Sequence, residues 1–282
     1  ISQPGYIAQI GTTYNLVAQV EDDPNCVRAP GVPRNADMQV RDATTIDMTL
    51  VTPIRKLIGT LQYACFTRID VATEVNKLAK TMNKPIQEDY DDAIQVAQYL
   101  VNTPTYGVVF RTSEDGVRLV AWADASFEAE GEGYSRSGIC FSIGEDSGAF
   151  LAKSFTQFNR SLSTQESEIQ ALSEAVRYVM YFRYILEDAG FPQDPTTVFE
   201  DNNAAISFTK GQGDYGRTKH IARHYRYSVD RQTANEIDVI RIDTEDQRAD
   251  QFTKVLDVST HAKATYANLN LGYEILDHEN SK

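Results

Sequence analysis

Long apolar runs and cysteine pairs are scarce in this sequence. No apolar stretch approaches the roughly 18–20 residues that a bilayer-spanning helix needs, so we expect no membrane partner. The three cysteines, Cys26, Cys65 and Cys140, share no metal-ligand spacing, and their odd number argues against a disulfide framework and for a reducing, intracellular setting. The start, Ile1 to Tyr6, lacks a basic and then apolar segment and an initiator Met, so we expect no secretory signal and a piece of a longer protein.

Basic residues are also few, which restricts the kinds of partner. Lysine and arginine total 27 against 40 aspartates and glutamates, and the net charge is −13. A nucleic-acid binder usually presents a basic surface to the phosphates. If this chain binds nucleic acid, the positive charge must come from bound divalent cations, from a separate basic patch or from a neighbouring domain.

What is present is enough for two ordinary folded domains. The chain has 282 residues, of which 41% are hydrophobic and 24% charged, and it contains no long low-complexity run. In the first part, Ile54, Leu57, Ile58, Leu61 and Cys65 repeat at helical spacing. Similar patterns predict further helices over 5–19, 70–78 and from about 86 to 104, so residues 1–105 read as a mainly helical module.

After residue 110 the hydrophobic period changes from three or four to two. Strand patterns and helix patterns then alternate in the order βββ-α-β-α-α-β-α, which predicts an α/β fold with a mixed five-stranded sheet and flanking helices. The predicted strands are 117–123, 138–143, 148–152, 196–200 and 237–242. The predicted helices are 165–189, 202–209, 221–233 and 245–255.

Four carboxylates occupy informative places in this pattern. Asp124 ends the first strand, Glu168 lies in the first turn of the long helix, Asp201 ends the fourth strand and Asp250 lies in the last helix. Strand ends and helix starts of an α/β fold meet at one edge of the sheet, so these residues are expected to converge. Taken singly, an aspartate at a strand end is more often a turn or cap residue, and Glu168 alone would be an ordinary helix-dipole partner.

Converging carboxylates point to divalent-metal chemistry. Crowded carboxylates repel one another, and hard cations such as Mg²⁺, which prefer oxygen ligands, relieve that repulsion. Two such ions about 3.5–4 Å apart can act on a phosphodiester from both sides of an in-line displacement.

Four ordered motifs carry a resemblance to a known family. They are Ser163-Thr-Gln-Glu-Ser-Glu-Ile-Gln-Ala171, Asp201-Asn-Asn-Ala-Ala-Ile206, Thr218-Lys-His-Ile221 and Ala249-Asp-Gln-Phe-Thr-Lys-Val-Leu256. Together they resemble the ribonuclease H domain of copia-like (Pseudoviridae) LTR retrotransposon polyproteins. The family usually has Pro where Val255 stands and Asp-Trp where Ser126-Phe127 stands.

The resemblance continues upstream of the nuclease motifs. Leu57-Ile-Gly-Thr-Leu-Gln-Tyr63 and Thr67-Arg-Ile-Asp-Val71, with Ile69 in place of the usual Pro, are similar to the segment between the reverse transcriptase palm and the nuclease. The resemblance implies a thumb and connection region over 1–110, a ribonuclease H domain over 111–258 and a C-terminal helix or tail over 259–282. No Tyr-x-Asp-Asp polymerase motif occurs, so we expect no DNA synthesis by this chain alone.

The family's functional residues carry over to this sequence one by one. Asp124, Glu168, Asp201 and Asp250 match the catalytic metal ligands for two Mg²⁺ ions, with Mn²⁺ as a substitute. Glu166 is the alternative to Glu168, and the spacing Glu168-Ile-x-Ala favours the latter. Arg217, Lys219 and His220 are candidate substrate-binding residues, although the basic pair can equally be ordinary solvated surface and His220 a packed or capping residue.

The resemblance implies a function and its setting. We expect endonucleolytic hydrolysis of the RNA strand of RNA–DNA hybrids during reverse transcription. The expected partners are the hybrid, the palm and fingers of the same polyprotein, and a second copy of the chain in a homodimer. The expected location is cytoplasmic, within virus-like particles. The alternative, from a different class, is a non-catalytic thumb and nuclease-fold module that binds hybrid or a partner subunit in a reverse transcriptase or a domesticated retroelement protein.

Overall fold

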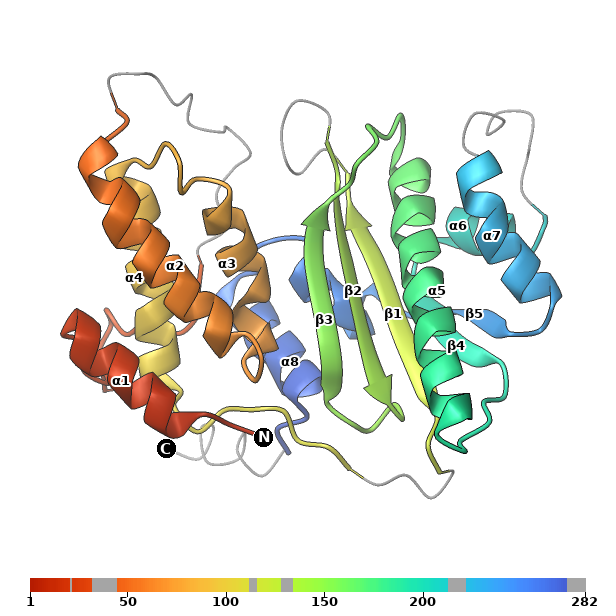
Figure 1. Cartoon of the computed structure of the whole chain (residues 1–282), viewed down its shortest axis with the longest axis horizontal. Helices are drawn as coiled ribbons and strands as arrows, with labels where there is room; N and C mark the ends of the chain where they lie inside the picture. The colour runs from red at the N-terminus through yellow and green to blue at the C-terminus, as the bar shows by residue number, and fades with distance from the viewer. Residues whose placement is uncertain (21, 32–44, 112–115, 128–133, 213–221, 273–282) are drawn as a thin grey trace. The chain divides into compact units, whose positions relative to one another are not determined.

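The chain forms two compact units in the computed structural model, which describes residues 1–20, 22–31, 45–111, 116–127, 134–212 and 222–272 (Figure 1). The helical unit takes described residues of Ile1–Val109 and of Val255–Lys282, and the sheet unit takes those of Phe110–Lys254. The sheet unit is therefore an insertion in the chain of the helical unit. The division into domains over 1–110, 111–258 and 259–282 stays a prediction. In the described residues no helix combines the length and apolar composition needed to span a bilayer.

The helical unit is built on the apolar periodicity seen in the sequence. Ile54, Leu57, Ile58 and Leu61 of one helix are fully buried and form the centre of its core. The helices of this unit are α1 (Pro4–Tyr14), α2 (Val51–Ala64), α3 (Ala72–Ala79), α4 (Gln87–Asn102) and α8 (Val258–Leu269), with short 3₁₀ turns η1 (Met48–Leu50) and η2 (Ile69–Val71). Helix α1 ends five residues before the expected position, because Asn15 adopts a left-handed conformation (φ 55°) that closes the helix.

A buried ion pair holds the C-terminal helix α8 in the helical unit. Arg68 donates to both oxygens of Asp70, at 3.0 and 2.8 Å, and Tyr99 donates to the same carboxylate. The imidazole Nε2 of His261, on α8, hydrogen-bonds the backbone oxygen of Asp70 at 3.0 Å. The motif that contains Arg68 and Asp70 thus stabilises the helical unit. The segment expected as a C-terminal helix or tail contributes α8, which packs in the same unit.

The sheet unit has the strand order β3-β2-β1-β4-β5. Strand β1 is antiparallel to β2 and parallel to β4, β2 is antiparallel to β3, and β4 is parallel to β5. The strands are β1 (Leu119–Ser126), β2 (Arg136–Ile143), β3 (Ala149–Thr156), β4 (Thr196–Glu200) and β5 (Ile237–Arg241). This mixed sheet with flanking helices, preceded by a helical portion, confirms the expected ribonuclease H-like fold class.

The long helix α5 (Thr164–Asp188) covers one face of the sheet, with α6 (Asn203–Thr209) and α7 (Ala222–Thr233) beside it (Figure 1). Its residues Ile169, Leu172 and Val176 pack against apolar side chains of β1, β2, β4 and β5 in one continuous core. The spacing of three and four residues between these side chains fixes which face of α5 packs on the sheet. It therefore also fixes which residues of its first turns point to the sheet edge.

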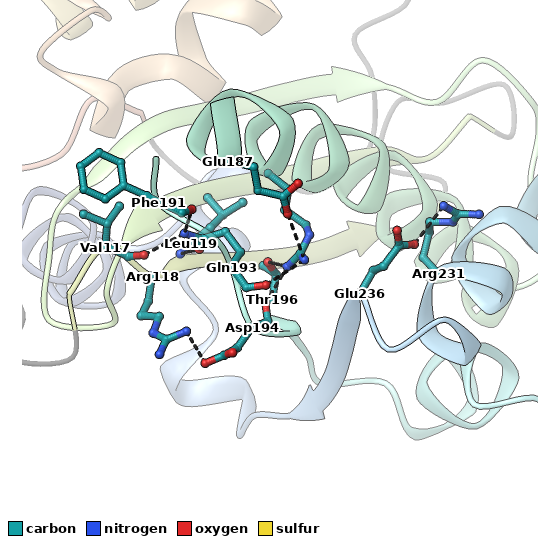
Figure 2. A network of polar contacts seen from close by, with 11 residues as sticks. Val117, Arg118, Leu119, Glu187, Phe191, Gln193, Asp194, Thr196, Arg231 and Glu236 are labelled. Carbon is teal, nitrogen blue, oxygen red and sulfur yellow. Dashed lines mark hydrogen bonds and ion pairs between the residues drawn. The ribbon is translucent and has the colours of Figure 1, made fainter. Parts of the chain in front are cut away.

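A polar network at the opposite edge clamps the end of α5 to the strands (Figure 2). Gln193 accepts from the backbone N–H of Leu119, at 2.9 Å, and donates to the carbonyl of Val117, at 2.8 Å. Arg183 of α5 donates to Thr196 at the start of β4 (3.0 Å) and to the carbonyl of Gln193. The network ties α5, β1 and β4 together where the strands begin, which helps to fix their relative register.

The segment after β5 corrects one sequence expectation. A helix was expected over 245–255, but the chain forms two 3₁₀ turns, η3 (Thr244–Asp246) and η4 (Arg248–Phe252). Gln247 between them is extended (ψ 100°), its side-chain oxygen accepts from Ala249 N–H, and its amide donates to the carbonyl of Ala123 at 2.9 Å. This tertiary contact with β1 prevents a continuous helix.

Gly138 is required where η4 approaches the sheet. A Cβ at this position would lie 2.5 Å from the carbonyl oxygen of Ala249 and 2.8 Å from the side chain of Thr253. Gly138 also pairs with Asp124 across β1 and β2. We predict that Gly138→Ala destabilises the sheet unit by about 1–3 kcal/mol, since the backbone must shift to relieve the overlap. Unfolding followed by the fluorescence of Trp122, the single tryptophan, measures this.

Gly59→Ala is the matched control. A Cβ at Gly59, inside α2, would meet open space, so this variant should leave the Trp122 transition unchanged and stabilise the helical unit by up to about 1 kcal/mol. An unchanged Trp122 transition in Gly138→Ala would contradict the close approach of η4 to β2.

Candidate metal centre

Asp124 lies near the carboxyl end of β1 and is almost fully buried. The hydroxyl of Thr253 donates to its Oδ2 at 2.7 Å. Because η4 is fastened to β1 by Gln247, Thr253 stands in a fixed position over the strand end. The sequence therefore places a buried carboxylate at the sheet edge and supplies one oriented donor for it.

Glu168 reaches the same place from the start of α5. It is 5% exposed, and a hydrogen bond from the backbone of Ala125 links it to β1. Its Oε2 has no hydrogen-bond partner in the described part of the chain. Glu166, the alternative considered for this position, instead accepts from the backbone N–H of Leu162 at 2.7 Å, while Ser163 caps the helix by accepting from Glu166 N–H. Glu166 thus closes the helix start and Glu168 faces the sheet edge.

Asp201 completes a group of three carboxylates. Strand β4 is parallel to β1 with Trp122 beside Phe199, so the residues two positions further on, Asp124 and Asp201, follow at the same level. Oxygen atoms of Asp124, Glu168 and Asp201, one from each, lie within 4.8 Å of one another. The hydroxyl of Thr244 donates to Asp201 Oδ2 at 2.8 Å.

Asp250 lies next to this group, on η4, with a lysine attached. Its Oδ1 is 2.5 Å from the ammonium of Lys254. After burial, the charge of Asp250 is the strongest influence on the ionisation of Asp124, ahead of the charge of Asp201. The structure therefore brings all four expected carboxylates to one edge, three of them with oxygens within 4.8 Å of one another and the fourth as a charged neighbour of Asp124.

Burial and crowding raise the pKa values of the two buried carboxylates, Asp124 and Glu168. Burial raises the pKa of Asp124 to about 7, with a further increase from the charge of Asp250 and an opposing effect of the Thr253 hydrogen bond. Burial, followed by the charges of Asp124 and Asp201, raises the pKa of Glu168 to about 9. Without a cation, these two carboxyl groups are held partly or fully protonated at neutral pH.

Sequence reasoning missed one further carboxylate, Glu200. It is fully buried at the end of β4, and burial followed by the charge of Glu168 raises its pKa well above the usual value. The sequence did indicate that Glu200 points inward. Side chains alternate along a strand, so Glu200 lies on the same face of β4 as Val198, which packs in the core. Lys254, whose side chain is half-exposed, is the other charged neighbour that the motif contained but the reasoning did not use.

The donor set fits a hard divalent cation. All the converging ligands are carboxylate oxygens, the type that Mg²⁺ and Mn²⁺ take and that soft metals do not select. The buried Oε2 of Glu168 lacks any donor within the described chain, as expected of an atom that binds a metal. The ion pair between half-exposed Lys254 and Asp250 stabilises the fold by only about 0–1 kcal/mol. An uncompensated buried charge costs several kcal/mol, so this pair does not offset the crowded carboxylates.

The candidate substrate-binding residues cannot be placed in this way. Arg217, Lys219 and His220 lie outside the described residues, so their proposed role stays a prediction.

Comparison with known proteins identifies relatives in one class. No family model matches the sequence. The chain is 27% identical over 207 residues to the retrovirus-related Pol polyprotein from transposon RE2 of Arabidopsis thaliana, covering 73% of this chain and 14% of that polyprotein. It is 27% identical over 205 residues to that from transposon TNT 1-94 of Nicotiana tabacum, and 24% identical over 216 residues to the Ty1-JR1 Gag-Pol polyprotein of Saccharomyces cerevisiae.

These relatives confirm the resemblance to Pol polyproteins of copia-like retrotransposons. The chain spans 12–15% of the length of the three relatives. Among solved structures, ribonuclease H1 from Halobacterium salinarum aligns with 48% of this chain at 19% identity and a TM-score of 0.35, and the Prototype Foamy Virus protease-reverse transcriptase with 85% at 13% and 0.32. Scores below 0.5 do not establish a shared fold, which rests here on the strand order of the sheet unit.

The raised pKa values of Asp124 and Glu168 predict an unusual pH dependence for the metal-free protein. Between the unfolded-state values, about 4, and the folded-state values, about 7 and 9, the folded protein holds protons that the unfolded chain has released. The free energy of unfolding in EDTA should therefore fall as pH rises from about 5 to 9.

Chemical unfolding followed by Trp122 fluorescence checks the sign of this slope. Asp124→Asn should remove the part of the slope that belongs to Asp124 and serves as the control for general surface repulsion. Stability that rises with pH over this interval in EDTA, or an equal slope in both proteins, would show that the two carboxylates are not crowded as described.

Proposed function

We propose that this chain, whose relatives are Pol polyproteins of copia-like retrotransposons, is a ribonuclease H region that hydrolyses the RNA strand of RNA–DNA hybrids. The observation that carries the proposal is the convergence of Asp124, Glu168 and Asp201 within 4.8 Å at one sheet edge, with Asp250 beside them. These four residues would hold two Mg²⁺ ions, with Mn²⁺ able to replace them.

Each residue has a distinct task in the proposed reaction. Bound divalent ions would supply an activated water and neutralise the charge that develops on the leaving oxygen. Asp124, oriented by Thr253, has both Glu168 and Asp250 as charged neighbours and would be a ligand of the bound ions. Thr244 orients the carboxylate of Asp201. Lys254, paired with Asp250, would lose this partner to a metal that Asp250 binds.

We propose a setting for this reaction as well. In a Pol polyprotein this region would act with the palm and fingers of the same chain, in cytoplasmic virus-like particles, on hybrids made during reverse transcription. A homodimer is a further partner arrangement that gel filtration would test. The non-catalytic module remains the competing function, and the net charge of −13 is the observation in its favour.

Asp124→Asn should abolish cleavage while the protein stays folded. The amide cannot replace the charge of the carboxylate at a metal, so the rate of cutting of a labelled hybrid should fall by more than roughly 100-fold, since even outer-sphere groups are worth 10–100-fold. Stability in EDTA should be unchanged or higher, because one crowded charge is removed. Unfolding of the variant, or cleavage near the wild-type rate, would assign Asp124 a structural role. A wild-type protein that binds hybrid without cutting it would favour the non-catalytic module.

Glu168→Gln should be far more damaging to cleavage than Glu166→Gln. Glu168 has a free oxygen facing the carboxylate group, whereas both contacts of Glu166 with Leu162 and Ser163 belong to the helix start. Cleavage rates of the two variants, measured at saturating Mg²⁺, give the comparison. Equal losses, or the reverse order, would overturn the choice of Glu168 over Glu166.

A further inference from the structure

Glu200 is a buried carboxylate that the four-ligand pattern does not include. Its side chain is fully buried at the end of β4. Its Oε1 accepts from the backbone N–H of Asn202 at 3.1 Å, which stabilises the turn into α6. Its Oε2 has no hydrogen-bond partner among the described residues. The hydrogen bond with Asn202 therefore explains the position of Oε1, whereas no contact within the described residues explains that of Oε2.

The carboxylate of Glu200 is a neighbour of the candidate metal centre. Along β4 the side chains alternate, and Val198 packs in the core against α5, so Glu200 lies on the side of the sheet from which Glu168 approaches. The carboxylate that acts most strongly on Glu200 is Glu168, followed by Asp124 and Asp201. Glu168 also has an unpartnered Oε2. Two neighbouring buried carboxylates thus each leave one oxygen without a donor.

A purely structural role does not account for this arrangement. The turn contact with Asn202 needs only a neutral acceptor, which glutamine supplies without the cost of a buried charge. A buried acceptor left without a partner is costly, and two such oxygens lie at this edge. Among the described residues no group supplies a donor to either, so both are open to a bound group.

We propose that Glu200 is a fifth carboxylate of the metal site, an outer-sphere ligand that accepts a hydrogen bond from water on an ion held by Glu168 and Asp201. Glu200 is not in the group whose oxygens lie within 4.8 Å of one another, which favours contact through water over direct ligation. Mg²⁺ keeps several of its waters in proteins, and those waters need acceptors. Glu200 is then a positioning residue, and its role rests on the proposed metal site.

The matched substitution is Glu200→Gln. It keeps the shape and an acceptor for Asn202 N–H and removes only the charge. We expect Mn²⁺ affinity, measured by calorimetry on the full chain, to weaken by about 10–100-fold, the usual effect of losing an outer-sphere partner. The rise in melting temperature at a fixed Mn²⁺ concentration should shrink in parallel. In EDTA the variant should be as stable as the wild type or more so.

Two further variants separate this role from a packing role. Glu166→Gln removes the charge of another buried glutamate, one that accepts from Leu162 N–H at the start of α5, and should leave Mn²⁺ affinity unchanged. Glu200→Asp keeps the charge on a shorter side chain. An outer-sphere role predicts that Asp retains more affinity than Gln, whereas a packing role predicts that the isosteric Gln is tolerated better.

The outcomes distinguish the two levels of the argument. Wild-type protein that binds no Mn²⁺ would refute the metal site itself, and with it the proposed function. Wild-type binding with equal affinity in Glu200→Gln would refute only the role of Glu200. Loss of stability of Glu200→Gln in EDTA, or higher metal affinity in Gln than in Asp, would likewise assign Glu200 to packing.

Discussion

Mutual repulsion of carboxylates at the end of β1 is the constraint on which the sheet unit depends. Oxygens of Asp124, Glu168 and Asp201 meet within 4.8 Å, and the burial of Asp124 and Glu168 removes most of the water that would screen these two charges. Lys254 neutralises Asp250 but remains half-exposed, so it contributes too little to balance the others. The folded chain therefore keeps some of these groups protonated or binds a cation, and stability and metal affinity are coupled at this edge.

The rest of the fold holds these groups together against their repulsion. Gln247 fixes η4 to β1, Gly138 allows η4 to come close, and Thr253 thereby reaches Asp124. At the far edge, the network around Gln193 and Arg183 ties α5 to the starts of β1 and β4 (Figure 2). These contacts hold η4 against β1 at one end of the strands and α5 against β1 and β4 at the other.

Much of this arrangement was predictable from the sequence, and the failures have physical reasons. Strand periodicity and the meeting of strand ends and helix starts at one sheet edge predict that Asp124 and Asp201 converge, and the spacing Glu168-Ile-x-Ala favours Glu168 over Glu166. The 3₁₀ turn that carries Asp250 was mistaken for a helix, because the contact of Gln247 with β1 is not local in sequence. Glu200 was missed because the family motif begins at Asp201 and does not include the residue before it. Alternation along β4 alone predicts that the glutamate points inward.

The excess of acidic residues is also less of an objection to hybrid binding than the total suggests. Electrostatic potential at a phosphate is set by charges within about one Debye length, roughly 8 Å at physiological ionic strength. At the sheet edge, the four ligand carboxylates and Glu200 would carry five negative charges, which two divalent cations and Lys254 would cancel. Acidic residues elsewhere on the surface act on solubility more than on this contact. In the proposed metal site, the potential that a phosphodiester meets would thus change from negative to near neutral when the ions bind, so metal occupancy would decide whether the carboxylate cluster repels a substrate.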